Sequence, residues 1–213
     1  MYTNKQQEEI IKKYTDEMEI IKLRTNQIFT ALGKIDYLEP TIEYKALQLR
    51  KIIEQILLAS LIANADEYKQ FYNRLGNEWN ARLICRDIER INPAFFPRAV
   101  INHPDIMKID DAPDSMNSDE LLTIYEKMGR LLHANNPFST PPDYHKLSEY
   151  IDESCKKIMG LLSTHTIRLI GGDDFLFVVM NASNHGGHVA INWFTKCDEE
   201  ETKEFLSQNH YQE

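Results

Sequence analysis

The chain has 213 residues and a mass of 24.9 kDa, with 42% hydrophobic and 27% charged residues, which is typical of a soluble globular protein with a buried core. No stretch approaches the roughly 18 uninterrupted apolar residues of a membrane span, and residues 1–13 lack the pattern of a secretory signal, so we expect a cytoplasmic protein without a membrane partner. The formal net charge of -9 disfavours a long non-specific nucleic-acid surface but leaves room for a local RNA site.

Two long amphipathic helices are predicted in the first third of the chain. Apolar residues recur at three- and four-residue steps over residues 4–32, with charged residues between them. Residues 41–64 form the most apolar helical run, which we expect at the centre of a helical bundle. Within this second helix Arg50 and Glu54 stand four residues apart, so their side chains share one face and can form an ion pair.

The middle of the chain is predicted to contain two short helices and a long connection. The short helices span residues 66–75 and 78–91. Residues 93–117 contain four prolines and no sustained hydrophobic period, which predicts a long loop or crossover.

Two further helices complete the predicted bundle. The first has Ser118 at its N-cap and runs to His133 or Ala134, where a polar stretch and Pro137 end it. The second is capped by Asp143 and runs to about residue 163.

The hydrophobic period changes from helical to extended near the C-terminus. Residues 166–170, 175–181 and 188–195 are rich in β-branched and aromatic residues and are separated by glycine-containing turns. This pattern predicts a small three-stranded antiparallel meander, which needs to pack on the helices to be stable.

The predicted fold class is therefore mainly α, a helical bundle with a small C-terminal three-stranded antiparallel β-meander. We place the bundle at residues 1–163 and the meander packed on it at residues 164–197. Residues 198–213 are acidic and are predicted to form a tail or short helix.

The best candidate site lies where the helix beginning at Ser118 ends. Arg130 and His133 are three residues apart, so both side chains can address one ligand group such as a phosphodiester. Arginine can stabilise charge on the phosphate, and histidine can transfer a proton. The alternative is that both residues only stabilise the negative end of the helix dipole. Candidate orienting residues for a substrate are Asn135, Asn136, Arg50 and Glu54.

The run LRKIIEQILL in the second helix and the later segment Gly-Arg-Leu-Leu-His resemble the HEPN superfamily of small helical bundles, over about residues 41–163. Many HEPN members are dimeric, metal-independent ribonucleases in phage defence or toxin–antitoxin systems, with an arginine and a histidine on one helix. His133 matches the family histidine and Arg130 loosely matches the arginine, with two residues between them where the usual motif has four to six. The only pair separated by four residues, Arg98 and His103, lies in the predicted loop and is interpreted as a chance match.

Two functions follow from the residues and the resemblance. The first is a HEPN-like interaction protein of a defence or toxin system, which acts without catalysis on a protein partner such as an antitoxin. The second is a metal-independent endoribonuclease that uses Arg130 and His133. Both functions imply a homodimer, as the resemblance suggests, and neither needs a cofactor. We also expect no metal ion, because the histidine- and aspartate-containing segments Asn184–His188 and Gly171–Asp174 are interpreted as turns between strands. The short Arg–His spacing and acidic charge favour the first, whereas the polar cluster at one helix end favours the second.

Overall fold

The structure is a computed structural model. It describes residues 2–31, 38–64, 80–103, 108–133, 138, 140–171 and 173–195. The short helix predicted at residues 66–75 and the predicted acidic tail at 198–213 lie outside the described residues.

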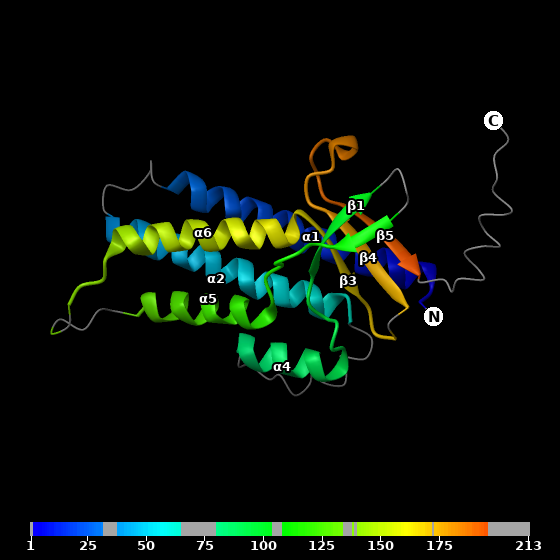
Figure 1. Ribbon diagram of the computed structural model, residues 1–213, viewed down its shortest axis with the longest axis horizontal. Coiled ribbons are helices and arrows are strands. Elements are labelled where there is room, and N and C mark those ends of the chain that lie inside the picture. Colours follow the sequence, from blue (N-terminus) through cyan, green and yellow to red (C-terminus); the bar gives the residue numbers. More distant parts are fainter. Residues whose placement is uncertain are drawn as a thin grey trace, which may run out of the picture.

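The described part of the chain contains five α-helices, which are α1 (Asn4–Thr30), α2 (Leu38–Ile62), α4 (Ala81–Ile91), α5 (Ser118–Leu131) and α6 (Tyr144–Ser163). Helices α1, α2, α5 and α6 lie side by side, and α4 lies beside α5 (Figure 1). Helix α2 contacts each of the other four helices, which confirms its predicted central place. None of the helices that the structure describes is long and apolar enough to cross a membrane.

The ends of α5 and α6 agree with the predicted helix boundaries in part. Asp143 caps α6, as predicted, by accepting a hydrogen bond from the backbone N–H of Lys146. The N-cap of α5 is Asn117 rather than Ser118, because Asn117 and Glu120 form a reciprocal capping box. Helix α5 ends at Leu131, so His133 lies just beyond the helix instead of on its last turn.

Within the described residues the sheet has five antiparallel strands, so the prediction of three was wrong. They are β1 (Arg98–His103), β2 (Lys108–Asp111), β3 (Thr164–Arg168), β4 (Asp174–Val179) and β5 (Ala190–Thr195). Their order is β2-β1-β3-β4-β5, so the predicted meander forms β3, β4 and β5 and is extended by a hairpin from the middle of the chain. The sheet lies at one end of the bundle (Figure 1).

The extra hairpin falls within residues 93–117, which were predicted as a loop because of their prolines. Two of those prolines border the strands, since Pro97 directly precedes β1 and Pro113 follows shortly after β2. A proline outside the hydrogen-bonded ladder costs the sheet nothing. Arg98 and His103 therefore belong to one strand, β1, instead of the predicted loop.

One face of the sheet, the inner face, packs against the bundle and forms part of the same core. His165 on β3 is fully buried there, and its Nε2 accepts a hydrogen bond from the Tyr14 hydroxyl of α1 at 2.9 Å. Its Nδ1 lies 2.8 Å from the carbonyl oxygen of Leu162, which fits a neutral ring protonated at Nδ1. Burial lowers the pKa of His165 to about 4, so this imidazole is a neutral structural link between helix and sheet.

Candidate functional site

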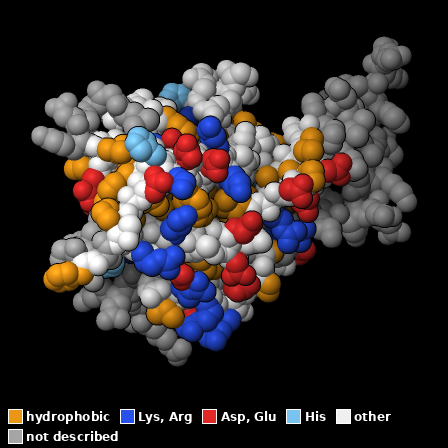
Figure 2. Space-filling view, turned by 60° about the vertical axis from the view of Figure 1, so that its left-hand side comes forward, with side chains coloured by type: hydrophobic (Ala, Val, Ile, Leu, Met, Phe, Trp, Pro, Cys, Tyr) orange, Lys and Arg blue, Asp and Glu red, His pale blue; other side chains and the backbone are white. Residues whose placement is uncertain are grey.

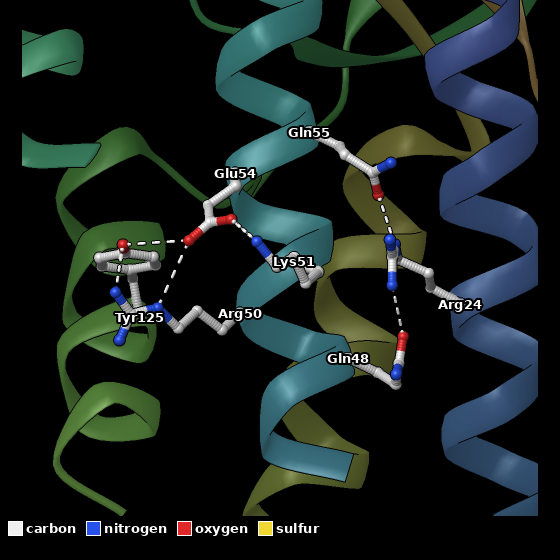
Figure 3. A network of polar contacts seen from close by, with 7 residues as sticks. All are labelled: Arg24, Gln48, Arg50, Lys51, Glu54, Gln55 and Tyr125. Atoms are coloured by element: carbon white, nitrogen blue, oxygen red, sulfur yellow. Dashed lines mark hydrogen bonds and ion pairs between the residues drawn. The ribbon is translucent and has the colours of Figure 1, made fainter. Parts of the chain in front are cut away.

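The predicted pair of Arg50 and Glu54 does form, at the interface of α2 and α5 (Figure 3). Arg50 Nε lies 3.4 Å from Glu54 Oε1, and Arg50 Nη2 donates to the Tyr125 hydroxyl at 2.7 Å. That hydroxyl in turn donates to Glu54 Oε1 at 3.2 Å. Lys51 Nζ donates to the other carboxylate oxygen at 2.8 Å. These four residues form what we call the α2–α5 polar network.

Burial makes each contact in the α2–α5 polar network matter energetically. Only 10% of the Glu54 side chain is exposed, so its charge depends on the two cations and the Tyr125 hydroxyl for compensation. Burial, and then the charge of Glu54, raise the pKa of Tyr125, with Arg50 acting in the opposite direction. The phenol therefore stays protonated and able to donate to Glu54.

Gly129 completes the packing of Arg50 against α5. A Cβ atom at this position would lie 2.9 Å from Arg50 Nη1, so the guanidinium fits closely over the glycine. The guanidinium carbon also lies 4.4 Å from the centre of the Tyr125 ring, which is a cation–π distance. Tyr125 and Gly129 are four residues apart on α5, so one helical face holds both contacts. The importance of Tyr125 and Gly129 was missed from the sequence, although their spacing was visible there.

The predicted catalytic pair lies apart from this network. Both Arg130 and His133 are exposed, and the His133 backbone N–H bonds to the Arg130 carbonyl at 3.4 Å past the end of α5. Among the described residues, the hydrogen-bond partners of the Glu54 carboxylate are Arg50, Lys51 and Tyr125, not His133. Asn135 and Asn136, the other predicted orienting residues, lie outside the described residues.

A cavity of about 220 Å³ lies beside the α2–α5 polar network. Its lining comes from α2, α5 and the start of α4, namely Arg50, Asn80, Arg82, Leu122, Tyr125 and Glu126. Arg82 is already paired with Glu126, at 2.5 Å from Nη2 and 2.8 Å from Nε. Arg130 and His133 are not among the described residues that line this cavity, whose two guanidinium groups are both compensated by carboxylates.

Helix α2 is also joined to α1 and α6 by polar contacts. Arg24 of α1 donates to Gln55 at 3.0 Å and to Gln48 at 2.6 Å (Figure 3). On another side, the fully buried Lys45 pairs with Asp152 of α6 at 2.5 Å. Buried polar contacts of this kind fix the relative positions of helices. Arg50 and Glu54 therefore belong to a set of groups that position α2.

No group of three or more histidine, cysteine, aspartate or glutamate side chains within the described ranges is arranged to hold a metal ion. Comparison with known proteins adds no relative, since the chain matches no protein-family model, no curated protein and no solved structure.

Proposed function

We propose that this chain is a HEPN-like interaction protein that acts without catalysis, in the defence or toxin–antitoxin setting that the resemblance implies. The observation that supports this is that the candidate catalytic pair, Arg130 and His133, lies apart from the candidate orienting residues Arg50 and Glu54. Arg50 and Glu54 are held by contacts inside the α2–α5 polar network, while Arg130 and His133 are exposed and lie outside it.

Phosphodiester cleavage needs a positioned proton-transfer group and a charge-stabilising group that act together on one substrate. Stabilisation of developing charge is strongest where water is excluded, and it weakens in a medium of high dielectric constant. Arg130 and His133 both lie at the protein surface, and no described contact fixes their side chains toward each other. The exposed positions of Arg130 and His133 therefore favour a role in binding over a role in catalysis.

The end of α5 has the residue types of a protein-binding surface. Arg130 and His133 are exposed there, and Phe138, a few residues further on, is 96% exposed. Arginine and aromatic side chains often dominate the binding energy of protein interfaces. Figure 2, in which this end of the bundle comes forward, shows basic and acidic side chains interspersed with hydrophobic ones, a mixture that suits a protein partner. We propose a second copy of the chain as one partner and an antitoxin-like protein as another.

The alternative, a metal-independent endoribonuclease, is favoured by one feature. Gly129 carries the Arg50 guanidinium against α5, and His133 follows four residues later, so a positive group lies about one turn before an accessible imidazole. A partner subunit that closed this region would create a less exposed environment for His133.

Incubation of purified protein with total RNA in EDTA separates the two functions. We expect the wild type, His133→Ala and Arg130→Ala to leave the RNA equally intact. Arg86→Ala, which removes another exposed arginine from a different helix, serves as the matched control. If the wild type and Arg86→Ala cleave the RNA but His133→Ala does not, the interaction proposal is overturned and the endoribonuclease alternative is established.

Light scattering tests the proposed homodimer. We expect a dimer in the wild type and a shift toward monomer in Phe138→Asp, because a charge in an apolar contact opposes association. A monomeric wild type at the highest soluble concentration would contradict self-association.

A further inference from the structure

The face of the sheet that points away from the bundle, which we call the outer face, carries phenylalanines beside arginines. Strand alternation defines it, because His165 and Ile167 of β3 are buried on the inner face while Thr166 and Arg168 point outward. The register then aligns outward residues of neighbouring strands. Arg168 lies opposite Phe175, which lies opposite Phe194 on β5.

A second row runs parallel to the first across four strands. Arg98 of β1 lies opposite Thr166, which is followed across the sheet by Phe177 and Asn192. The two rows are two residues apart along each strand, or roughly 7 Å. Neighbouring strands are about 4.8 Å apart, so each arginine lies roughly 5 to 10 Å from a phenylalanine in its own row.

The three phenylalanines form one aromatic cluster. The rings of Phe175 and Phe194 are stacked, with centroids 5.5 Å apart and planes inclined by 20°. Phe177 contacts Phe194 edge-on at 6.3 Å and is itself buried. Phe194 is 43% exposed although it packs in this cluster, so part of one aromatic ring is held in place by its neighbours and faces solvent.

The charges of this face are positive on balance, in contrast to the chain as a whole. Arg98 has a carboxylate neighbour in Asp111, at 3.6 Å, and both side chains are largely exposed. Arg168 is exposed, and no carboxylate among the described residues lies within ion-pair distance of its guanidinium. Two guanidinium groups against one carboxylate therefore flank the aromatic cluster.

We infer that the outer face is a binding surface for single-stranded nucleic acid. An exposed ring on a rigid sheet offers a stacking surface for an unpaired base, and nearby guanidinium groups complement phosphates. Duplexes present their bases only at the edges, which cannot stack on Phe194. The amide of Asn192 and the hydroxyl of Thr166, both on this face, add hydrogen-bonding groups for base edges.

This surface is distinct from the end of α5 that carries His133. A cavity beside β1 and β2 is lined by Arg98, Asp111 and Ser118, so α5 begins next to the sheet. The 14 residues of α5 then carry the chain about 21 Å away before His133 is reached (Figure 1). The outer face is therefore separate from the surface around His133, and the inference stands independently of the proposed protein partner.

Fluorescence anisotropy with a labelled oligouridine of about eight nucleotides tests the binding surface, a length within the usual site size for one small module. We expect saturable binding of oligouridine and of the matching oligothymidine, with weaker binding of a duplex of equal length. A tighter complex with the RNA than with the DNA would identify contacts to the 2′-hydroxyl. Absence of binding to either single strand, or equal binding of duplex and single strand, would overturn the inference.

Point variants locate the contact. Phe194→Ala is expected to weaken binding roughly 5- to 100-fold by removing a stacking surface, while Phe194→Trp keeps it and binds at least as well as the wild type. Arg168→Ala is expected to reduce the slope of log affinity against log salt by about 0.7, the value for one phosphate contact on a single strand.

Control variants remove an exposed apolar side chain and an exposed arginine at other places on the surface. Leu23→Ala on α1 removes an exposed apolar side chain, and Arg86→Ala on α4 removes an exposed arginine. Both should leave the affinity for oligouridine unchanged. Circular dichroism shows whether each variant is folded. Folded Phe194→Ala and Arg168→Ala that bind as tightly as these controls would assign the binding to another surface and contradict the inference.

Discussion

Two regions of the molecule combine arginine with an aromatic ring and use the combination differently. At the α2–α5 interface, Arg50 lies over Tyr125 and a carboxylate compensates its charge. On the outer face of the sheet, Arg168 lies opposite Phe175 and is exposed, and no carboxylate of the described residues pairs with its guanidinium. The same residue types therefore stabilise the fold in the first region and remain available to a ligand in the second. The two regions differ in whether a neighbouring carboxylate compensates the charge of the arginine, not in the types of residue they contain.

The largest expected effect is a loss of folding stability at low pH, caused by the buried His165 on the inner face of the sheet. The pKa of His165 is about 4 in the folded protein, below its ordinary value of 6.5, so the unfolded chain takes up the proton first as the pH falls. Stability that is present above pH 6.5 should decline by about 3 kcal/mol by pH 4. Urea unfolding at a series of pH values measures this decline. His165→Gln should remove this part of the slope, whereas the exposed His188→Gln should retain it.

The next largest effect is expected when Glu54, the carboxylate that compensates Arg50 at the α2–α5 interface, is removed. Glu54→Ala leaves Arg50 without its carboxylate in a site where only 31% of the arginine side chain is exposed. We expect the free energy of unfolding to fall by about 2 kcal/mol, less than for a fully buried pair because Arg50 retains some water. Chemical denaturation measures the change, and Glu126→Ala, which removes the more exposed carboxylate partner of Arg82, is the control. Equal stability of the two variants would show that the network is not structural.

A smaller effect is expected for Tyr125→Phe. The ring remains under Arg50, but the hydroxyl that links Arg50 Nη2 to Glu54 Oε1 is lost. The free energy of unfolding should fall by about 1 kcal/mol, the usual net value of one hydrogen bond. Thermal denaturation measures the change. Tyr150→Phe, which removes a hydroxyl from a ring on α6, is the control. A stabilised Tyr125→Phe variant would mean that the hydroxyl is poorly accommodated.

The smallest effect on stability is expected on the outer face. Arg168→Ala should change the free energy of unfolding by no more than about 0.5 kcal/mol, because its exposed guanidinium has no described carboxylate partner. Denaturation experiments run beside those on Glu54→Ala compare the two arginine environments directly. A loss of stability as large as that of Glu54→Ala would assign Arg168 a structural role and remove the distinction between the two regions.

Local sequence patterns predicted the helices well because each signal acts over a few residues. The recurrence of Ile10, Tyr14 and Met18 on α1 and the cap at Asp143 are examples, since both depend on neighbours within one or two turns. The ion pair of Arg50 and Glu54 was also visible, because a helix sets their separation. Mainly helical architecture and a C-terminal meander followed from these periods.

Contacts between distant segments decided the rest. The hairpin of β1 and β2 is stabilised by pairing with β3, some 65 residues later in the sequence, and short strands between prolines give little local signal. Tyr125 reaches Glu54 across 71 positions, so no local spacing reveals that Arg50 is compensated. The sequence by itself determined the helical faces and the residues able to bind or react. The tertiary structure alone decided which of those residues are enclosed by partners and which face water, because compensation depends on three-dimensional neighbours.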